Sequence, residues 1–185
     1  LADRSRKKIA VKSRQIGFSE ALVLEGLIEA SSTPGRDVFY ISTNLDNGAD
    51  LLRRTLKWIE RFRLVGIDVP VAESSATRIE FANGSRIKVL PNLPRSVRGK
   101  TGTLMLDELA FWPFDRELWT AILPTISSSP SLKIRVVSTP CGQDNLYYDL
   151  VHKGTGWSCH WVDVHRAVEE GFPVDIEELR ADYTS

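Results

Sequence analysis

The sequence predicts an α/β fold in which a mainly parallel sheet is flanked by helices. Short apolar segments alternate with amphipathic segments along the chain, an alternation typical of strand–helix–strand units. Two alternating apolar segments joined by Asn83-Gly84 predict an antiparallel hairpin at about 78–90. The chain has 185 residues, of which 42% are hydrophobic and 26% charged, which suits a single domain spanning 1–185.

The first half of the chain contains two strand–helix units. Residues 9–11 and 38–41 are short apolar runs and predict buried strands, followed by helices over 19–31 and 46–63. The first helix is expected to place Leu22, Leu27 and Ile28 on one face and Glu20, Glu25 and Glu29 at polar positions. In the second helix, a solvated face is expected to contain Arg53, Arg54, Lys57 and Arg61.

The second half continues the alternation after a basic loop. The loop 91–102 contains Arg95, Arg98 and Lys100 but no acidic residue. Further strands are predicted at 104–106, 134–137 and near 158–164, and further helices at 116–123 and 144–152. No apolar run approaches the roughly 18 residues that a membrane-spanning helix needs, so no membrane partner is expected.

Charge and cysteine content narrow the class of protein only slightly. The 24 basic and 24 acidic residues cancel, although the charged residues among the first 14 are mostly basic and those from Asp163 onward are mostly acidic. Such ends are either partner-binding or simply solvated, and for the acidic end we favour the solvated interpretation. Cys141 and Cys159 form no disulfide framework, which favours a reducing, intracellular setting.

The stretch KSRQIGFSE, residues 12–20, resembles the end of a phosphate-binding loop. Gly17 and Ser19 fit the pattern G-x-x-x-x-G-K-[ST], but Phe18 occupies the lysine position. Lys12, at the end of the preceding strand, is a candidate for the missing positive charge, and Arg14 is a second candidate. An ordinary strand–turn–helix connection fits this motif equally well when it is considered alone.

Two other strand ends carry polar residues. The strand near 104–106 ends in Asp107-Glu108, a pair suited to holding Mg²⁺ and activating water, or to the first turn of a helix. The strand 134–137 ends in Ser138-Thr139, whose hydroxyls are suited to sensing a phosphate or to leaving the sheet. Because parallel strands end at one edge of a sheet, we expect all three strand ends to lie together and bind nucleotide.

In this order, the three motifs resemble those of the ATPase domain of the phage terminase large subunit, a DNA-packaging motor. The resemblance rests on KSRQIGFSE, on RSVRGKTGTLMLDELAFW (residues 95–112) and on VVSTP (residues 136–140), and it covers nearly the whole chain. It implies a P-loop NTPase core of the Asp-Glu type, with the loop lysine displaced to Lys12. It also implies a nuclease domain downstream, which is expected to lie outside this chain. Because the first residue is Leu1 and not Met, we expect the chain to be a fragment of a longer protein.

The resemblance implies specific roles. The phosphates of ATP are expected to contact Lys12 and the loop residues Ser13, Arg14, Gln15, Ile16, Gly17, Phe18, Ser19 and Glu20. Mg²⁺ is expected at Ser19 and Asp107, with Glu108 as the catalytic base. Ser138 and Thr139 are expected to relay the state of the γ-phosphate. Arg98, in preference to Arg95, is expected to stabilise the transition state, although DNA-backbone contact or solubility explains this basic loop equally well.

The implied function is ATP-driven translocation of double-stranded DNA into a procapsid, in the host bacterial cytoplasm. The implied partners are further copies of the chain in a ring, the procapsid portal and the small terminase subunit. The sequence leaves two alternative functions open. One is a helicase-like nucleic-acid ATPase, and the other is a nucleotide- or DNA-binding module without turnover, which Phe18 at the lysine position favours.

Overall fold

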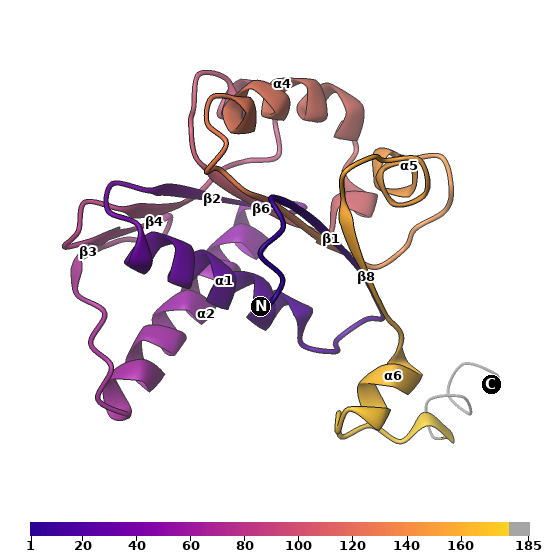
Figure 1. Cartoon of the computed structure of the whole chain (residues 1–185), viewed down its shortest axis with the longest axis horizontal. Helices are drawn as coiled ribbons and strands as arrows, with labels where there is room; N and C mark the ends of the chain where they lie inside the picture. Colours follow the sequence, from indigo (N-terminus) through magenta and orange to yellow (C-terminus); the bar gives the residue numbers. More distant parts are fainter. Residues whose placement is uncertain (178–185) are drawn as a thin grey trace.

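The computed structural model describes residues 1–177 and contains one eight-stranded sheet (Figure 1). The strand order is β3-β4-β5-β2-β6-β7-β1-β8. The six strands from β5 to β8 in this order are parallel to one another, whereas β4 pairs antiparallel with both β3 and β5 at one edge. The strands are β1 (Lys7–Lys12), β2 (Asp37–Ile41), β3 (Val71–Ser74), β4 (Arg78–Phe81), β5 (Arg86–Val89), β6 (Thr103–Asp107), β7 (Ile134–Ser138) and β8 (Ser158–Val162).

Helices cover both faces of the sheet and enclose two hydrophobic cores (Figure 1). On one face lie α1 (Phe18–Ser32) and α2 (Leu45–Leu64). The other face carries α3 (Pro94–Val97), the 3₁₀ turn η1 (Leu109–Phe111), α4 (Asp115–Ser127) and α5 (Leu146–His152), and α6 (Val164–Glu169) follows β8. No helix in the part of the chain that the structure describes is long and apolar enough to cross a membrane.

The predicted fold class is confirmed, including the parallel sheet and the hairpin, which is β4–β5. The structure adds β3 to this hairpin, and it adds α3 inside the segment predicted as a loop. The last strand ends at Val162 instead of near residue 164. It ends there because the Asp163 side chain accepts a hydrogen bond from the Arg166 backbone N–H and so caps α6.

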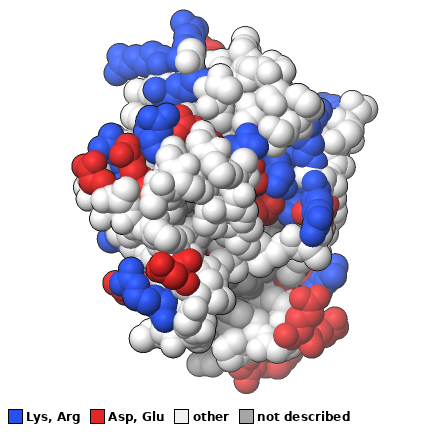
Figure 2. All heavy atoms as spheres, turned by 60° about the vertical axis from the view of Figure 1, so that its left-hand side comes forward, with Lys and Arg blue, Asp and Glu red and all other residues white. Residues whose placement is uncertain are grey.

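Two residues of α1 lie on the face opposite to the one expected. Ile28 is 45% exposed, whereas Glu29 is only 6% exposed and faces the sheet. The carboxylate of Glu29 is buried because basic side chains from the loops before β2 and β7 neutralise it there. Charged residues of both signs also mix over the surface in Figure 2, which shows no continuous basic stripe on that face.

The topology places the three motif-bearing strand ends side by side. β6, β7 and β1 are neighbours in the sheet and run parallel, so their carboxyl ends share one edge. The phosphate-loop segment, Asp107-Glu108 and Ser138-Thr139 all leave the sheet at this edge. The prediction that these three strand ends lie together is therefore confirmed.

Candidate functional site

The loop between β1 and α1 has the backbone of an anion-binding turn. Gly17 immediately precedes α1 with φ 86°, a left-handed conformation that glycine adopts without strain, and Gln15 has φ 59°. No side chain caps the N-terminus of α1. The first backbone N–H groups of this 15-residue helix therefore remain available to a negatively charged ligand.

Lys12 crosses from β1 to the other two strand ends. Its side chain is buried, and its ammonium donates to Glu108 Oε1 at 2.6 Å and to Thr139 Oγ1 at 3.0 Å. The displaced lysine thus lies at the centre of the site rather than at its rim. Arg14, the other candidate for the positive charge, is exposed.

Asp107 is held by two serine hydroxyls at the end of β6. Ser19 Oγ, from the first turn of α1, lies 3.5 Å from Asp107 Oδ1, and Ser42 Oγ donates to Oδ2 at 3.1 Å. Burial raises the pKa of Asp107 to about 6, and the negative charge of Glu108 adds to this shift. The carboxylate therefore lies in a place where ionisation is costly unless a cation accompanies it.

Glu108 adopts a left-handed backbone conformation, with φ 55°. Its Oε2 accepts from the Thr139 backbone N–H at 3.0 Å and lies 3.3 Å from the hydroxyl of Ser138. Left-handed conformations are costly for residues other than glycine and concentrate at functional sites. The end of β7 thus fixes one carboxylate oxygen of Glu108 while Lys12 binds the other.

Two cavities open on this cluster. One, of about 320 Å³, is lined by the loop residues Gln15, Ile16, Gly17, Phe18, Ser19 and Glu20 together with Lys12, Glu108 and Arg54. The other, of about 390 Å³, is lined by Lys12, Arg14, Gln15, Thr43, Asn47, Glu108, Phe111 and Thr139. The two cavities flank the phosphate loop and share Lys12, Gln15 and Glu108.

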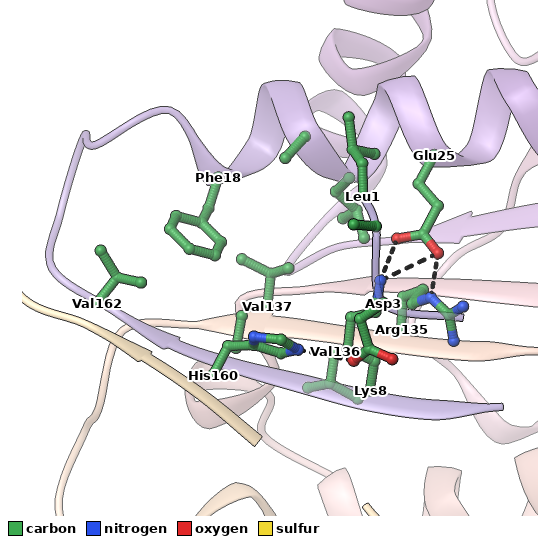
Figure 3. Close-up of a pocket in the computed structure, with 14 residues that line it drawn as sticks. Leu1, Asp3, Lys8, Phe18, Glu25, Arg135, Val136, Val137, His160 and Val162 are labelled. Carbon is green, nitrogen blue, oxygen red and sulfur yellow. Dashed lines mark hydrogen bonds and ion pairs between the residues drawn. The ribbon is translucent and has the colours of Figure 1, made fainter. Parts of the chain in front are cut away.

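A third cavity, of about 340 Å³, lies away from the strand ends on the α1 side of β1 and β8 (Figure 3). Its walls are mostly apolar, and Phe18 is the one residue predicted for the site that lines it. Phe18 also packs against the hydrophobic core beneath α1. Phe18 therefore contributes an apolar contact at the position where the usual motif has lysine.

The structure leaves two predicted site residues apart, Arg98 and Ser13, whose backbone N–H donates to Val162 O at 3.1 Å. Arg98 follows α3 and, like Arg95, is exposed, and neither arginine is among the residues that line the two cavities of the site. Sequence reasoning missed Ser42 and Arg54. Ser42 had a visible signal, since Ser42-Thr43 follows an apolar strand just as Ser138-Thr139 does.

The donor set at the site suits one kind of metal ion. Within residues 1–177, no group of three or more histidine, cysteine, aspartate or glutamate side chains is arranged to hold a metal. Ser19 and Asp107 offer two oxygen donors side by side. Mg²⁺ is commonly bound by one or two protein oxygens and takes its other ligands from water and substrate phosphates, so these residues fit it.

Comparisons with known proteins identify similar sequences. Residues 9–183 match the family described as terminase large subunit, T4likevirus-type, N-terminal. The chain is 30% identical to the Mu-like prophage FluMu protein gp28 of Haemophilus influenzae, with 92% of the chain and 36% of that relative covered. It is 26% identical to the probable terminase large subunit gp28 of Escherichia phage Mu, covering 91% of the chain and 34% of that relative. The chain thus spans about a third of the length of these relatives.

Solved structures show the same fold. The large terminase ATPase domain of Thermus phage P74-26 superposes with a TM-score of 0.75 at 21% identity, covering 97% of this chain and 87% of that one. The large terminase of a thermophilic bacteriophage in complex with ATP-gamma-S superposes with a TM-score of 0.67 at 13% identity, covering 97% of this chain and 43% of that one.

Proposed function

The chain belongs to the terminase large-subunit family, and from this premise we propose that it is an ATPase motor domain that drives double-stranded DNA into a procapsid. The observation that carries the proposal is the single cluster formed by Lys12, Asp107 and Glu108 beside the open N-terminus of α1. A phosphate chain, a divalent cation and an attacking water each have a chemically suited partner in this cluster.

In the proposed role, the backbone from Arg14 to Ser19 and the side chain of Lys12 bind the phosphates of ATP. Ser19 and Asp107 hold Mg²⁺, which neutralises charge on the phosphates when bound. The raised pKa of Asp107 supports a cation at this position, because a cation offsets the cost of burying the ionised carboxylate.

Glu108 is the proposed base that orients the attacking water and takes its proton. In this structure its Oε1 accepts from the Lys12 ammonium at 2.6 Å, which makes that oxygen a weaker base. We expect the phosphates to draw the Lys12 ammonium away and so free this oxygen. The other oxygen stays fixed by the backbone N–H of Thr139. Ser138 and Thr139 thereby connect the state of the γ-phosphate to β7.

Arg98 is proposed to act on a neighbouring copy of the chain. It is exposed and lines neither cavity of its own site, as a residue that serves another subunit in a ring would be. The portal, the small terminase subunit and the DNA are the further partners proposed for the whole protein. A nuclease activity of the whole protein is likewise only proposed, outside residues 1–185.

Thermal stability with and without a non-hydrolysable Mg²⁺–ATP analogue tests the nucleotide site. Ligand that binds the folded state raises stability by mass action, so the wild-type chain should melt at a higher temperature with the analogue. The shift should vanish in Lys12→Ala. A shift in both proteins would assign the phosphate-binding positive charge to Arg14 instead of Lys12. No shift in either protein would contradict the proposed site.

A binding module without turnover is the second candidate, and Phe18 at the usual lysine position favours it. It predicts the same thermal shift but no phosphate release by the full-length protein.

A further inference from the structure

Arg54 lies beside the phosphate loop although it comes from α2. Of the residues that line the 320 Å³ cavity, Lys12 and Arg54 are the two with basic side chains. We propose that Arg54 is a nucleotide-binding residue whose guanidinium donates a hydrogen bond to a phosphate oxygen. The inference deepens the proposed function and rests on it. It replaces the interpretation of Arg54 as part of a solvated helix face.

Two carboxylates hold the guanidinium in position. Arg54 Nε donates to Asp50 Oδ2 at 2.9 Å, one helical turn earlier on α2. Arg54 Nη1 donates to Glu20 Oε1 at 2.6 Å, in the first turn of α1. A guanidinium that is already fixed loses little conformational entropy when it binds a further acceptor.

One part of this guanidinium remains available. Nε and Nη1 are engaged, whereas none of the described residues accepts a hydrogen bond from Nη2. The Arg54 side chain is 39% exposed and borders the cavity, so a ligand there can reach it. Phosphate oxygens are among the preferred partners of arginine, and hydrogen bonds between two charged groups are about twice as strong as neutral ones.

Arg54 also has a second role, which is to neutralise the carboxylate of Glu20 beside the cavity. Glu20 directly follows Ser19, so its bare carboxylate would repel phosphates at the N-terminus of α1. Arg54 and Trp58 both bind this carboxylate, and Trp58 Nε1 donates to Oε2 at 2.8 Å. Lys12 is already opposed by Glu108. Arg54 therefore neutralises Glu20, and its Nη2 remains available as a hydrogen-bond donor at the cavity.

Arg53 provides a matched control on the same helix. It contacts the same Asp50 carboxylate at 3.3 Å, but its side chain is 64% exposed and it is not among the residues that line the cavity. Replacing Arg53 removes one positive charge near Asp50 and leaves the proposed phosphate contact in place.

The experiment is a titration of each purified variant with a fluorescent, non-hydrolysable ATP analogue in the presence of Mg²⁺. Arg54→Gln should weaken binding by about tenfold or more, the loss expected for one charge-assisted hydrogen bond. Arg54→Lys should retain part of the affinity, because it keeps the charge. Arg53→Gln should bind as the wild type does.

A Glu20→Gln background separates the two tasks of Arg54. If Arg54 binds a phosphate oxygen, Arg54→Gln should still cost about tenfold in this background. If Arg54 only neutralises Glu20, the loss should disappear there, which would overturn the inference. Equal binding by wild type and Arg54→Gln would also overturn it. A wild-type chain that binds no analogue would instead contradict the proposed function and remove this inference with it.

Discussion

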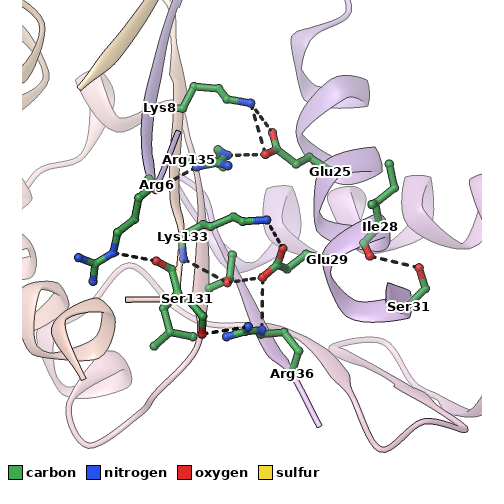
Figure 4. Close-up of polar contacts among 12 residues, drawn as sticks. Arg6, Lys8, Glu25, Ile28, Glu29, Ser31, Arg36, Ser131, Lys133 and Arg135 are labelled. Carbon is green, nitrogen blue, oxygen red and sulfur yellow. Dashed lines mark hydrogen bonds and ion pairs between the residues drawn. The ribbon is translucent and has the colours of Figure 1, made fainter. Parts of the chain in front are cut away.

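Two clusters of buried charge lie along α1, and they differ in which sign is in excess. The cluster beside the middle and end of α1 contains more basic than acidic groups (Figure 4). Its ion pairs are Lys8–Glu25, Arg135–Glu25, Lys133–Glu29 and Arg36–Glu29. Each glutamate is thus bound by two basic side chains, which fasten α1 to the sheet and the loops beside it.

The cluster at the N-terminus of α1 has the opposite balance. Asp107 and Glu108 face a single buried lysine, Lys12, and hydroxyl groups supply the remaining side-chain contacts to the two carboxylates. This cluster also opens on two cavities. Cavities also border the first cluster, where Arg135 Nη2 is buried without a hydrogen-bond partner among the described residues. The comparison indicates that the first cluster already binds its carboxylates with basic side chains, whereas the second has a carboxylate in excess and is suited to accept a cation.

The largest effect is expected from Glu108→Gln in the full-length protein. An amide cannot take a proton from water, so ATP hydrolysis should fall by about 10²- to 10⁴-fold while nucleotide binding persists. Phosphate release measures the first and fluorescence titration the second. Glu25→Gln makes the same chemical change in the other cluster and should hydrolyse ATP far faster than Glu108→Gln. Hydrolysis by Glu108→Gln at the wild-type rate would refute the proposed mechanism.

In the basic cluster, Glu25→Gln should affect stability instead. Lys8 and Arg135 would lose the carboxylate that neutralises them, and breaking a buried ion pair from one side typically costs about 3–5 kcal/mol. Urea denaturation measures the free energy of unfolding. Glu60→Gln, at an exposed position on α2, is the control and should change little. A Glu25→Gln variant as stable as this control would show that the cluster does not fasten α1.

In the acidic cluster, removing a carboxylate should stabilise the folded chain instead of destabilising it. The reason is that the pKa of Asp107 is raised to about 6 from an ordinary value of 3.8. The folded chain therefore binds this proton more tightly than the unfolded chain. The stabilisation is complete below about pH 4 and is lost as the pH rises through 6. Without metal, Asp107→Asn should be more stable than wild type by up to about 3 kcal/mol at pH 7.5.

That difference should shrink to about 1 kcal/mol at pH 4.5 and approach zero below pH 3.8, where Asp107 is protonated in both the folded and the unfolded chain. Urea denaturation at the two pH values in the presence of a chelator measures it. A difference that stays constant across this range would show that Asp107 is not the group that titrates.

Features encoded locally were predictable from the sequence. Apolar runs and turn residues predicted the parallel sheet and the β4–β5 hairpin, and polar residues at strand ends marked the site. β3 was missed because most of its residues are exposed and show no apolar alternation. The burial of Glu29 was missed because its basic partners lie far from it in sequence, in Arg36 and Lys133.

The same limit explains why Arg54 was interpreted as a surface residue. On α2 it has the spacing of a polar face, and its contact with Glu20 joins residues 34 positions apart. Only the packing of α2 against α1 brings it to the phosphate loop. Ser42, by contrast, was predictable from the sequence, because it is a hydroxyl residue directly after an apolar strand.

The smallest effect is expected from Ser42→Ala, which tests whether Ser42 orients Asp107 for a cation. Ser42 is 1% exposed, and its hydroxyl fixes Asp107 Oδ2 at 3.1 Å, so its loss should leave the carboxylate less well oriented for a cation. Loss of such a supporting contact typically lowers metal affinity by about tenfold or more, so half-maximal binding of the ATP analogue should need about ten times more Mg²⁺. Ser31→Ala, at an exposed position on the same face of the sheet, is the control. An unchanged Mg²⁺ requirement in Ser42→Ala would show that Ser19 alone suffices to orient Asp107.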